Sequence, residues 1–145
     1  MKKTISLTFI LFASVIFIAS CSKGPGEGGK AAIKGKVFVR NYDATFTQLY
    51  ASYYAQDEDV YIIYGDDATF SRSVKTNYDG TYVFPYLRPG KYKVFTYSKD
   101  TVKYLNGQPN YSGNVVASKT VHVLKEVEIV GKKDTTVVPD LEIVK

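Results

Sequence analysis

The chain is poor in three residue types that many small functional sites require. It contains one cysteine, one histidine and no tryptophan among 145 residues. A single cysteine cannot form an intrachain disulfide, so the core alone has to stabilise the fold. One cysteine and one histidine also cannot assemble a zinc site, and we expect neither a metal nor a cofactor. The lack of tryptophan weighs against a polysaccharide-binding face.

Charge is absent from one long stretch near the start of the chain. Lys2 and Lys3 precede residues 4–22, none of which is charged. A basic start, an apolar run and small residues before a cleavage point are typical of a secretory signal peptide. The alternative is a transmembrane helix, because 19 uncharged residues reach the lower end of a bilayer span. Serine and threonine within the run favour the signal peptide.

The end of this stretch, Ile18-Ala19-Ser20-Cys21, resembles the lipobox of bacterial lipoproteins, which are cleaved before a lipidated cysteine. The resemblance implies a signal peptide over residues 1–20 and a lipid on Cys21 that holds the mature chain at a membrane. Ser22 resembles the outer-membrane sorting pattern, and the run of acidic residues that marks surface export in some groups is absent. We therefore predict an outer-membrane lipoprotein of a Gram-negative cell, facing the periplasm rather than the exterior.

The mature chain is only mildly basic. Removal of Lys2 and Lys3 with the signal lowers the formal net charge from +5 to +3. The remaining basic residues are spread singly, whereas a nucleic-acid site concentrates them on one face. No nucleic-acid partner is expected.

Glycine and proline divide the mature chain into a spacer and a domain. Residues 22–30 contain four glycines and one proline, a composition typical of flexible linkers. We predict a lipidated flexible tether over residues 21–30. Residues 31–145 are predicted to form a single domain, which is long enough to bury a core without covalent cross-links.

Apolar and polar residues alternate through this domain with a period of two, between turn signals. This pattern predicts an all-β domain. Residues 60–64 are apolar on both faces and are expected to form a central strand. Asp79-Gly80 predicts a hairpin tip. Pro85 lies inside a predicted strand that carries Tyr82, Phe84 and Tyr86 on one face, and it indicates a sheet edge or a bulge.

Residues 76–94, TNYDGTYVFPYLRPGKYKV, resemble the carboxypeptidase regulatory-like and Cna-B-like families. The shared motif is a turn followed by alternating aromatics, then Leu-x-Pro-Gly-x-Tyr-x-Val. The resemblance implies a transthyretin-like (prealbumin-like) Greek-key β-sandwich of about seven strands. It also implies a non-enzymatic accessory or docking role. The residues expected in the core are Tyr82, Phe84, Leu87, Tyr92 and Val94.

Two long connections, residues 41–59 and 100–118, depart from that family pattern. The first is rich in tyrosine and is followed by acidic residues around the 60–64 strand. Tyrosines on loops can stack on sugars or anchor a protein, and the alternative is a hydrophobic lid over the core. The acidic residues are either calcium ligands or solvated charges. The predicted binding surface comprises Tyr42, Tyr50, Tyr53, Tyr54, Asp57, Glu58, Asp59, Asp66 and Asp67.

No catalytic arrangement is recognisable. His122 alternates away from the predicted core side and has no nucleophile motif beside it, so we expect an exposed strand residue. We predict a non-enzymatic, membrane-anchored accessory or docking domain of the cell envelope, with an envelope protein as its partner. The alternative is a small carbohydrate-binding module that uses the tyrosines of the 41–59 insert.

Overall fold

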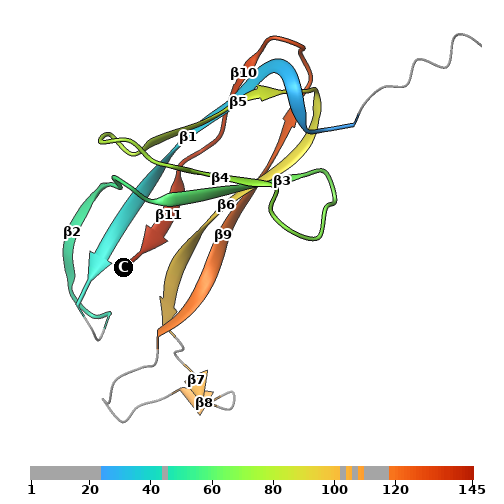
Figure 1. Cartoon of the computed structure of the whole chain (residues 1–145). Helices are drawn as coiled ribbons and strands as arrows, with labels where there is room; N and C mark the ends of the chain where they lie inside the picture. Colours follow the sequence, from blue (N-terminus) through green and yellow to red (C-terminus); the bar gives the residue numbers. More distant parts are fainter. Residues whose placement is uncertain (1–23, 44–45, 102–103, 106–107, 110–117) are drawn as a thin grey trace, which may run out of the picture.

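The computed structural model describes residues 24–43, 46–101, 104–105, 108–109 and 118–145. Within these ranges the chain is all-β, with eleven strands in two larger sheets and a small hairpin (Figure 1). None of these residues belongs to a helix that could cross a membrane. The strands are β1 (Glu27–Tyr42), β2 (Leu49–Tyr54), β3 (Asp59–Tyr64), β4 (Arg72–Lys75), β5 (Thr81–Leu87), β6 (Gly90–Thr101), β7 (Tyr104–Leu105), β8 (Gln108–Pro109), β9 (Ser118–Ile129), β10 (Thr135–Val137) and β11 (Leu141–Val144).

The first sheet is built around β1, whose 16 residues are long enough to pair with two strands in series on each edge. On one edge β5 and then β2 run antiparallel to it. On the other edge β10 and then β11 run parallel to it. This one long strand therefore holds together a sheet of five strands.

The second sheet is antiparallel, with the order β4-β3-β6-β9. β6 and β9 are in register over their full length, from Gly90 opposite Ile129 to Thr101 opposite Ser118. β3 lies between β4 and β6, which confirms the central strand predicted for residues 60–64.

One apolar core lies between the two sheets, which gives a sandwich-like arrangement. Ile33, Val37 and Val39 of β1 contribute from one sheet and Val60 and Ile62 of β3 from the other, all fully buried. The period-two alternation is confirmed. The five residues predicted for the core from the 76–94 motif are also all buried: Tyr82, Phe84, Leu87, Tyr92 and Val94.

β5 contains the irregularity that Pro85 predicts. Ile33 pairs with Phe84 and Ala31 pairs with Leu87. Between these two pairs β5 therefore contains one residue more than β1. Tyr86 takes a φ of 62° and is exposed. This bulge reverses the alternation, so that Leu87 enters the core where the simple pattern placed Tyr86. β5 pairs with β1 alone among the described strands, as expected of an edge.

Two further predictions about the strands need correction. The two larger sheets contain nine strands rather than about seven, because the 41–59 insert contributes β2 and the C-terminal segment divides into β10 and β11. Asp79-Gly80 forms a turn, with Gly80 at a φ of 76°, but this is not a hairpin tip. The turn joins β4 of the second sheet to β5 of the first, and these strands do not pair.

The tether prediction is wrong for residues 24–30, which belong to the folded domain. β1 begins at Glu27, and the Gly26 amide donates to the Tyr92 hydroxyl over 2.9 Å. Arg88 donates from its amide to the Gly26 carbonyl and from Nε to the Gly24 carbonyl, both over 2.9 Å. A Cβ on Gly29 would overlap the Leu87 carbonyl. The glycines therefore allow close backbone packing here, where their composition had indicated flexibility.

Candidate functional site

An aromatic cluster covers part of the second sheet on the side away from the core. We call it the aromatic face. The Tyr61 ring is central: it stacks on Phe95 at 5.1 Å and 18° and meets Phe70 edge-on at 4.9 Å. Tyr97 lies edge-on to both Tyr61 and Phe95, and His122 is 6.2 Å from Phe95. The members are Tyr61, Phe70, Phe95, Tyr97 and His122.

Strand register brings these side chains together. Tyr61 of β3 pairs with Phe95 of β6, and Tyr97 of β6 pairs with His122 of β9. Directly opposite residues share a face of the sheet, and successive residues alternate between faces. Val94 and Thr96 therefore point into the core while Phe95 and Tyr97 point out.

The aromatic face is half open to solvent. Phe95 is only 8% exposed because its neighbours cover it, whereas Phe70 is 50% and Tyr97 47% exposed. Burial raises the pKa of Tyr61 above its ordinary value, and the Asp59 carboxylate adds to the effect. The Tyr61 hydroxyl at the centre of the cluster is therefore uncharged at neutral pH.

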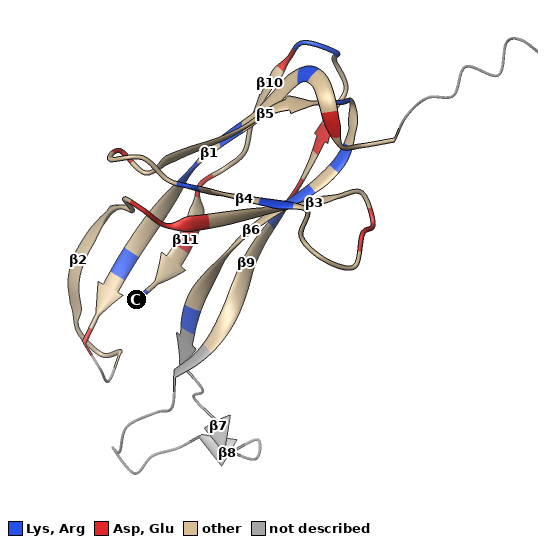
Figure 2. Ribbon diagram, in the orientation of Figure 1, with Lys and Arg blue, Asp and Glu red and all other residues tan. Residues whose placement is uncertain are grey.

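A groove of about 410 Å³ continues the same face toward the start of β6. Its lining includes Lys91 and Lys93 from β6 and Glu126 and Glu128 from β9, which face each other across the strand pair. Asp66 closes one side, 3.5 Å from the Lys93 ammonium. Residues of both charge signs thus lie along β6 and β9 (Figure 2).

Neither a known protein family nor a curated protein matches this chain. One similar solved structure is a "putative carbohydrate binding protein" of Pseudomonas aeruginosa. It is 13% identical, with 83% of this chain and 91% of that one covered, at a TM-score of 0.47. A likeness of that degree says nothing about what this chain binds.

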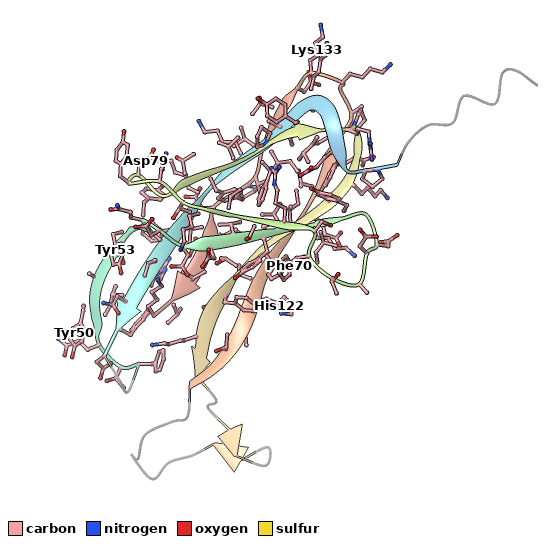
Figure 3. The ribbon with its side chains drawn as sticks, viewed as in Figure 1. Tyr50, Tyr53, Phe70, Asp79, His122 and Lys133 are labelled. Carbon is pink, nitrogen blue, oxygen red and sulfur yellow. The ribbon has the colours of Figure 1, made fainter. Side chains whose placement is uncertain are left out.

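The structure places the predicted tyrosines of the insert elsewhere: Tyr42 ends β1, and Tyr50, Tyr53 and Tyr54 lie on β2. Tyr50 is 65% exposed, and Tyr53 and Tyr54 are 43% exposed. Tyr53 and Tyr54 are consecutive in β2 and point to opposite faces of the sheet, so they cannot form one platform. They are also too exposed to be a lid over the core. Figure 3 shows Tyr50 and Tyr53 far from Phe70 and His122.

Local contacts hold two of these tyrosines in place. The Tyr54 hydroxyl donates to Asp140 over 3.1 Å, and the Lys36 ammonium lies 4.5 Å from the centre of its ring. Phe38 meets the same ring edge-on at 5.3 Å. Tyr42 packs against Phe46 at 6.5 Å. The rings of Tyr54 and Tyr42 therefore pack against other residues of the domain.

The predicted acidic residues are likewise not brought together. Asp57, Glu58 and Asp59 lie where β3 begins, and Asp66 and Asp67 follow its end, roughly 20 Å away for a six-residue strand. Asp59 pairs with Lys75 at 3.5 Å, and Glu58 pairs with Lys145. In the part of the chain that the structure describes, no three His, Cys, Asp or Glu side chains are placed to hold a metal ion. Cys21 lies outside the described residues.

The aromatic face is the surface that the sequence prediction missed, although two signals pointed to it. Residues 60–64 are apolar on both faces, and a strand in a two-layer fold needs only one apolar face. Phe95 and Tyr97 also alternate with Val94 and Thr96 along the strand, which places two aromatic residues on the face away from the core. His122 is exposed on its strand, as predicted, but belongs to this cluster.

Proposed function

We propose that this chain is a lipid-anchored, non-enzymatic docking domain of the cell envelope. Its fold is a variant of the transthyretin-like Greek-key sandwich, and it binds an envelope protein through the aromatic face. The observation that carries the proposal is the half-exposed cluster of Tyr61, Phe70, Phe95 and Tyr97 on a rigid sheet. Large exposed apolar patches on monomeric domains are typical of interaction sites.

The composition of this surface favours a protein partner. Aromatic residues at the centre and charged residues at the rim are typical of protein–protein interfaces. Here the rim holds the Lys93–Asp66 and Lys75–Asp59 ion pairs, at 3.5 Å each. Tyr61 and Phe95 stack on each other, so those two ring faces are not free to stack on a sugar.

A small carbohydrate-binding module is the second candidate, and the groove is the observation that favours it. Carboxylates and ammonium groups beside exposed rings could bind sugar hydroxyls while Phe70 or Tyr97 stacks on the pyranose ring. The groove would then replace the insert tyrosines as the sugar site. A glycan array separates the two candidates: sugar binding that is lost in Tyr97→Ala supports the second.

Site-specific cross-linking in intact cells tests the docking proposal. A photo-cross-linker at Tyr97 should give one discrete protein adduct, and the same group at Tyr50 should give none. The Tyr50 position is a matched control, because it is an exposed tyrosine on the other sheet. Phe70→Ala, which leaves the core untouched, should abolish the Tyr97 adduct. Equal adducts from both positions would refute the aromatic face as the docking surface.

The anchor has its own test. Labelled fatty acid should enter the wild-type chain, and Cys21→Ser should abolish both labelling and membrane retention. A wild-type chain without label would refute the lipoprotein part of the proposal and leave the docking surface untouched.

A further inference from the structure

The N-terminal segment leaves very little chain between Cys21 and the folded domain. Gly24 and Gly26 are bound to Arg88 and Tyr92, and Glu27 begins β1. Glu27 also accepts hydrogen bonds from the Arg72 guanidinium at 2.9 Å and the Tyr64 hydroxyl at 3.2 Å. The segment is therefore held by both sheets. Three residue steps separate Cys21 from Gly24, which span about 11 Å at full extension.

The surface around this attachment is the end of the sandwich formed by Gly24–Lys30, Arg88–Gly90 and Val130–Asp134, which we call the anchor end. The pairing of Ala32 with Thr135, and the hydrogen bond from the Ala32 amide to the Asp134 carbonyl at 2.9 Å, bring Lys30 close to the turn before β10. Figure 3 labels Lys133 at this end of the molecule.

Three lysines at the anchor end are exposed: Lys30, Lys132 and Lys133. None of them takes part in an ion pair among the described residues, and the same holds for exposed Lys99 near the other end of β6. Unpaired lysines near a membrane are attracted to anionic headgroups.

We propose that the anchor end lies directly on the membrane, with Lys30, Lys132 and Lys133 against anionic lipid headgroups. This inference rests on the proposed lipidation of Cys21. The connection of about 11 Å is comparable to the headgroup layer, so the domain cannot move freely away from the bilayer. The lysines then select one orientation. The aromatic face, which begins about five residues along β6 from Gly90, stands upright beside the membrane and faces neighbouring membrane proteins.

Fluorescence quenching in vesicles tests this orientation on the full lipidated chain. Lipidation consumes the only thiol, so a cysteine introduced at exposed Val130 or Tyr50 can be labelled alone. In vesicles of phosphatidylcholine and phosphatidylglycerol with nitroxide-labelled headgroups, the dye at Val130 should be quenched several-fold more than the dye at Tyr50. A ten-residue Gly-Ser insertion after Ser22 should reduce this difference. Equal quenching at both positions in the wild-type length would overturn the proposal.

The contribution of the lysines is tested in the chain with the longer tether, where docked and undocked domains can exchange. Lys133→Ala should lower the ratio of docked to undocked domains about fivefold on anionic vesicles. Lys99→Ala is the matched control, because exposed Lys99 lies near the other end of β6. Equal effects of the two substitutions would refute the basic contact. Complete loss of the wild-type chain from vesicles would instead mean that Cys21 carries no lipid.

Discussion

Tyr82 and Gly35 fit closely against each other in the core. The Tyr82 ring is fully buried, and its hydroxyl has no hydrogen-bond partner among the described residues. A Cβ added to Gly35 would overlap this hydroxyl and lie 2.6 Å from Cζ of the same ring. Glycine at position 35 therefore makes room for the aromatic side chain on the neighbouring strand β5.

We expect Gly35→Ala to lower the free energy of unfolding by about 1–3 kcal/mol, because a well-packed core cannot absorb the extra methyl group. Tyr82→Phe should raise it by about 1 kcal/mol, since it removes an unsatisfied buried hydroxyl. The free energy of unfolding of the double variant should be higher than the value obtained by adding the two single effects, because substitutions of residues in contact are not additive. Urea unfolding measures all three, and strict additivity would contradict the contact.

Buried tyrosines also determine the alkaline limit of stability. Burial raises the pKa of Tyr64, Tyr82 and Tyr92 above the ordinary value near 10. The unfolded chain therefore loses these protons at a lower pH than the folded chain. Their contribution is complete below pH 10 and is lost as the pH rises through the folded pKa values.

Urea unfolding at a series of pH values measures this contribution. The tyrosine contribution to the free energy of unfolding should stay constant up to about pH 9 and fall steeply above pH 10. Tyr82→Phe removes one of the shifted groups, so its stability should fall with a shallower slope. An identical slope in the variant, or stability that rises above pH 10, would contradict this prediction.

Among the elements, β2 is an unprotected edge strand. It pairs with β1 alone among the described strands, and its sequence LYASYY has no charge and no proline. Two other edge strands are better protected: β4 contains Arg72 and Lys75, and β5 contains Pro85 and a bulge. Open, uncharged edges tend to pair with strands of other molecules.

Ala51→Lys should therefore reduce self-association at high protein concentration without changing the free energy of unfolding by more than about 0.5 kcal/mol. Ala51 is exposed and faces Asn41 across the strand pair, so the new charge meets no like charge there. Light scattering against concentration measures the effect, with Gln56→Lys at an exposed position outside the strands as control. Equal effects at both positions would mean that net charge, rather than the β2 edge, controls association.

For the molecule as a whole, the first described residues are part of the fold rather than a linker. A mature chain shortened to begin at Ala31 loses the hydrogen bonds between Gly24, Gly26, Arg88 and the Tyr92 hydroxyl. We expect a loss of about 2–4 kcal/mol, at roughly 1 kcal/mol for each lost hydrogen bond plus the exposed surface. Thermal unfolding of the two chains measures it. A flexible tether over these residues would leave the stability unchanged.

The sequence alone determined the all-β class, the core positions of the 76–94 motif and the presence of a sheet edge or a bulge at Pro85. These follow from local chemistry: side chains alternate along a strand, and proline lacks an amide proton. Asp79-Gly80 was recognisable as a turn for the same reason, because Gly80 readily adopts positive φ.

Only the tertiary structure decided which strands pair and which outward residues meet. Two strands can flank the same turn and belong to different sheets, as β4 and β5 do. Tyr61, Phe95 and His122 lie on separate strands, and only the register of β3, β6 and β9 brings them together. Phe70 joins them from the loop between β3 and β4. Gly24–Lys30 has the composition of a linker, but backbone groups of distant residues bind it. Long-range pairing leaves no trace in local composition, so the candidate site depended on the fold.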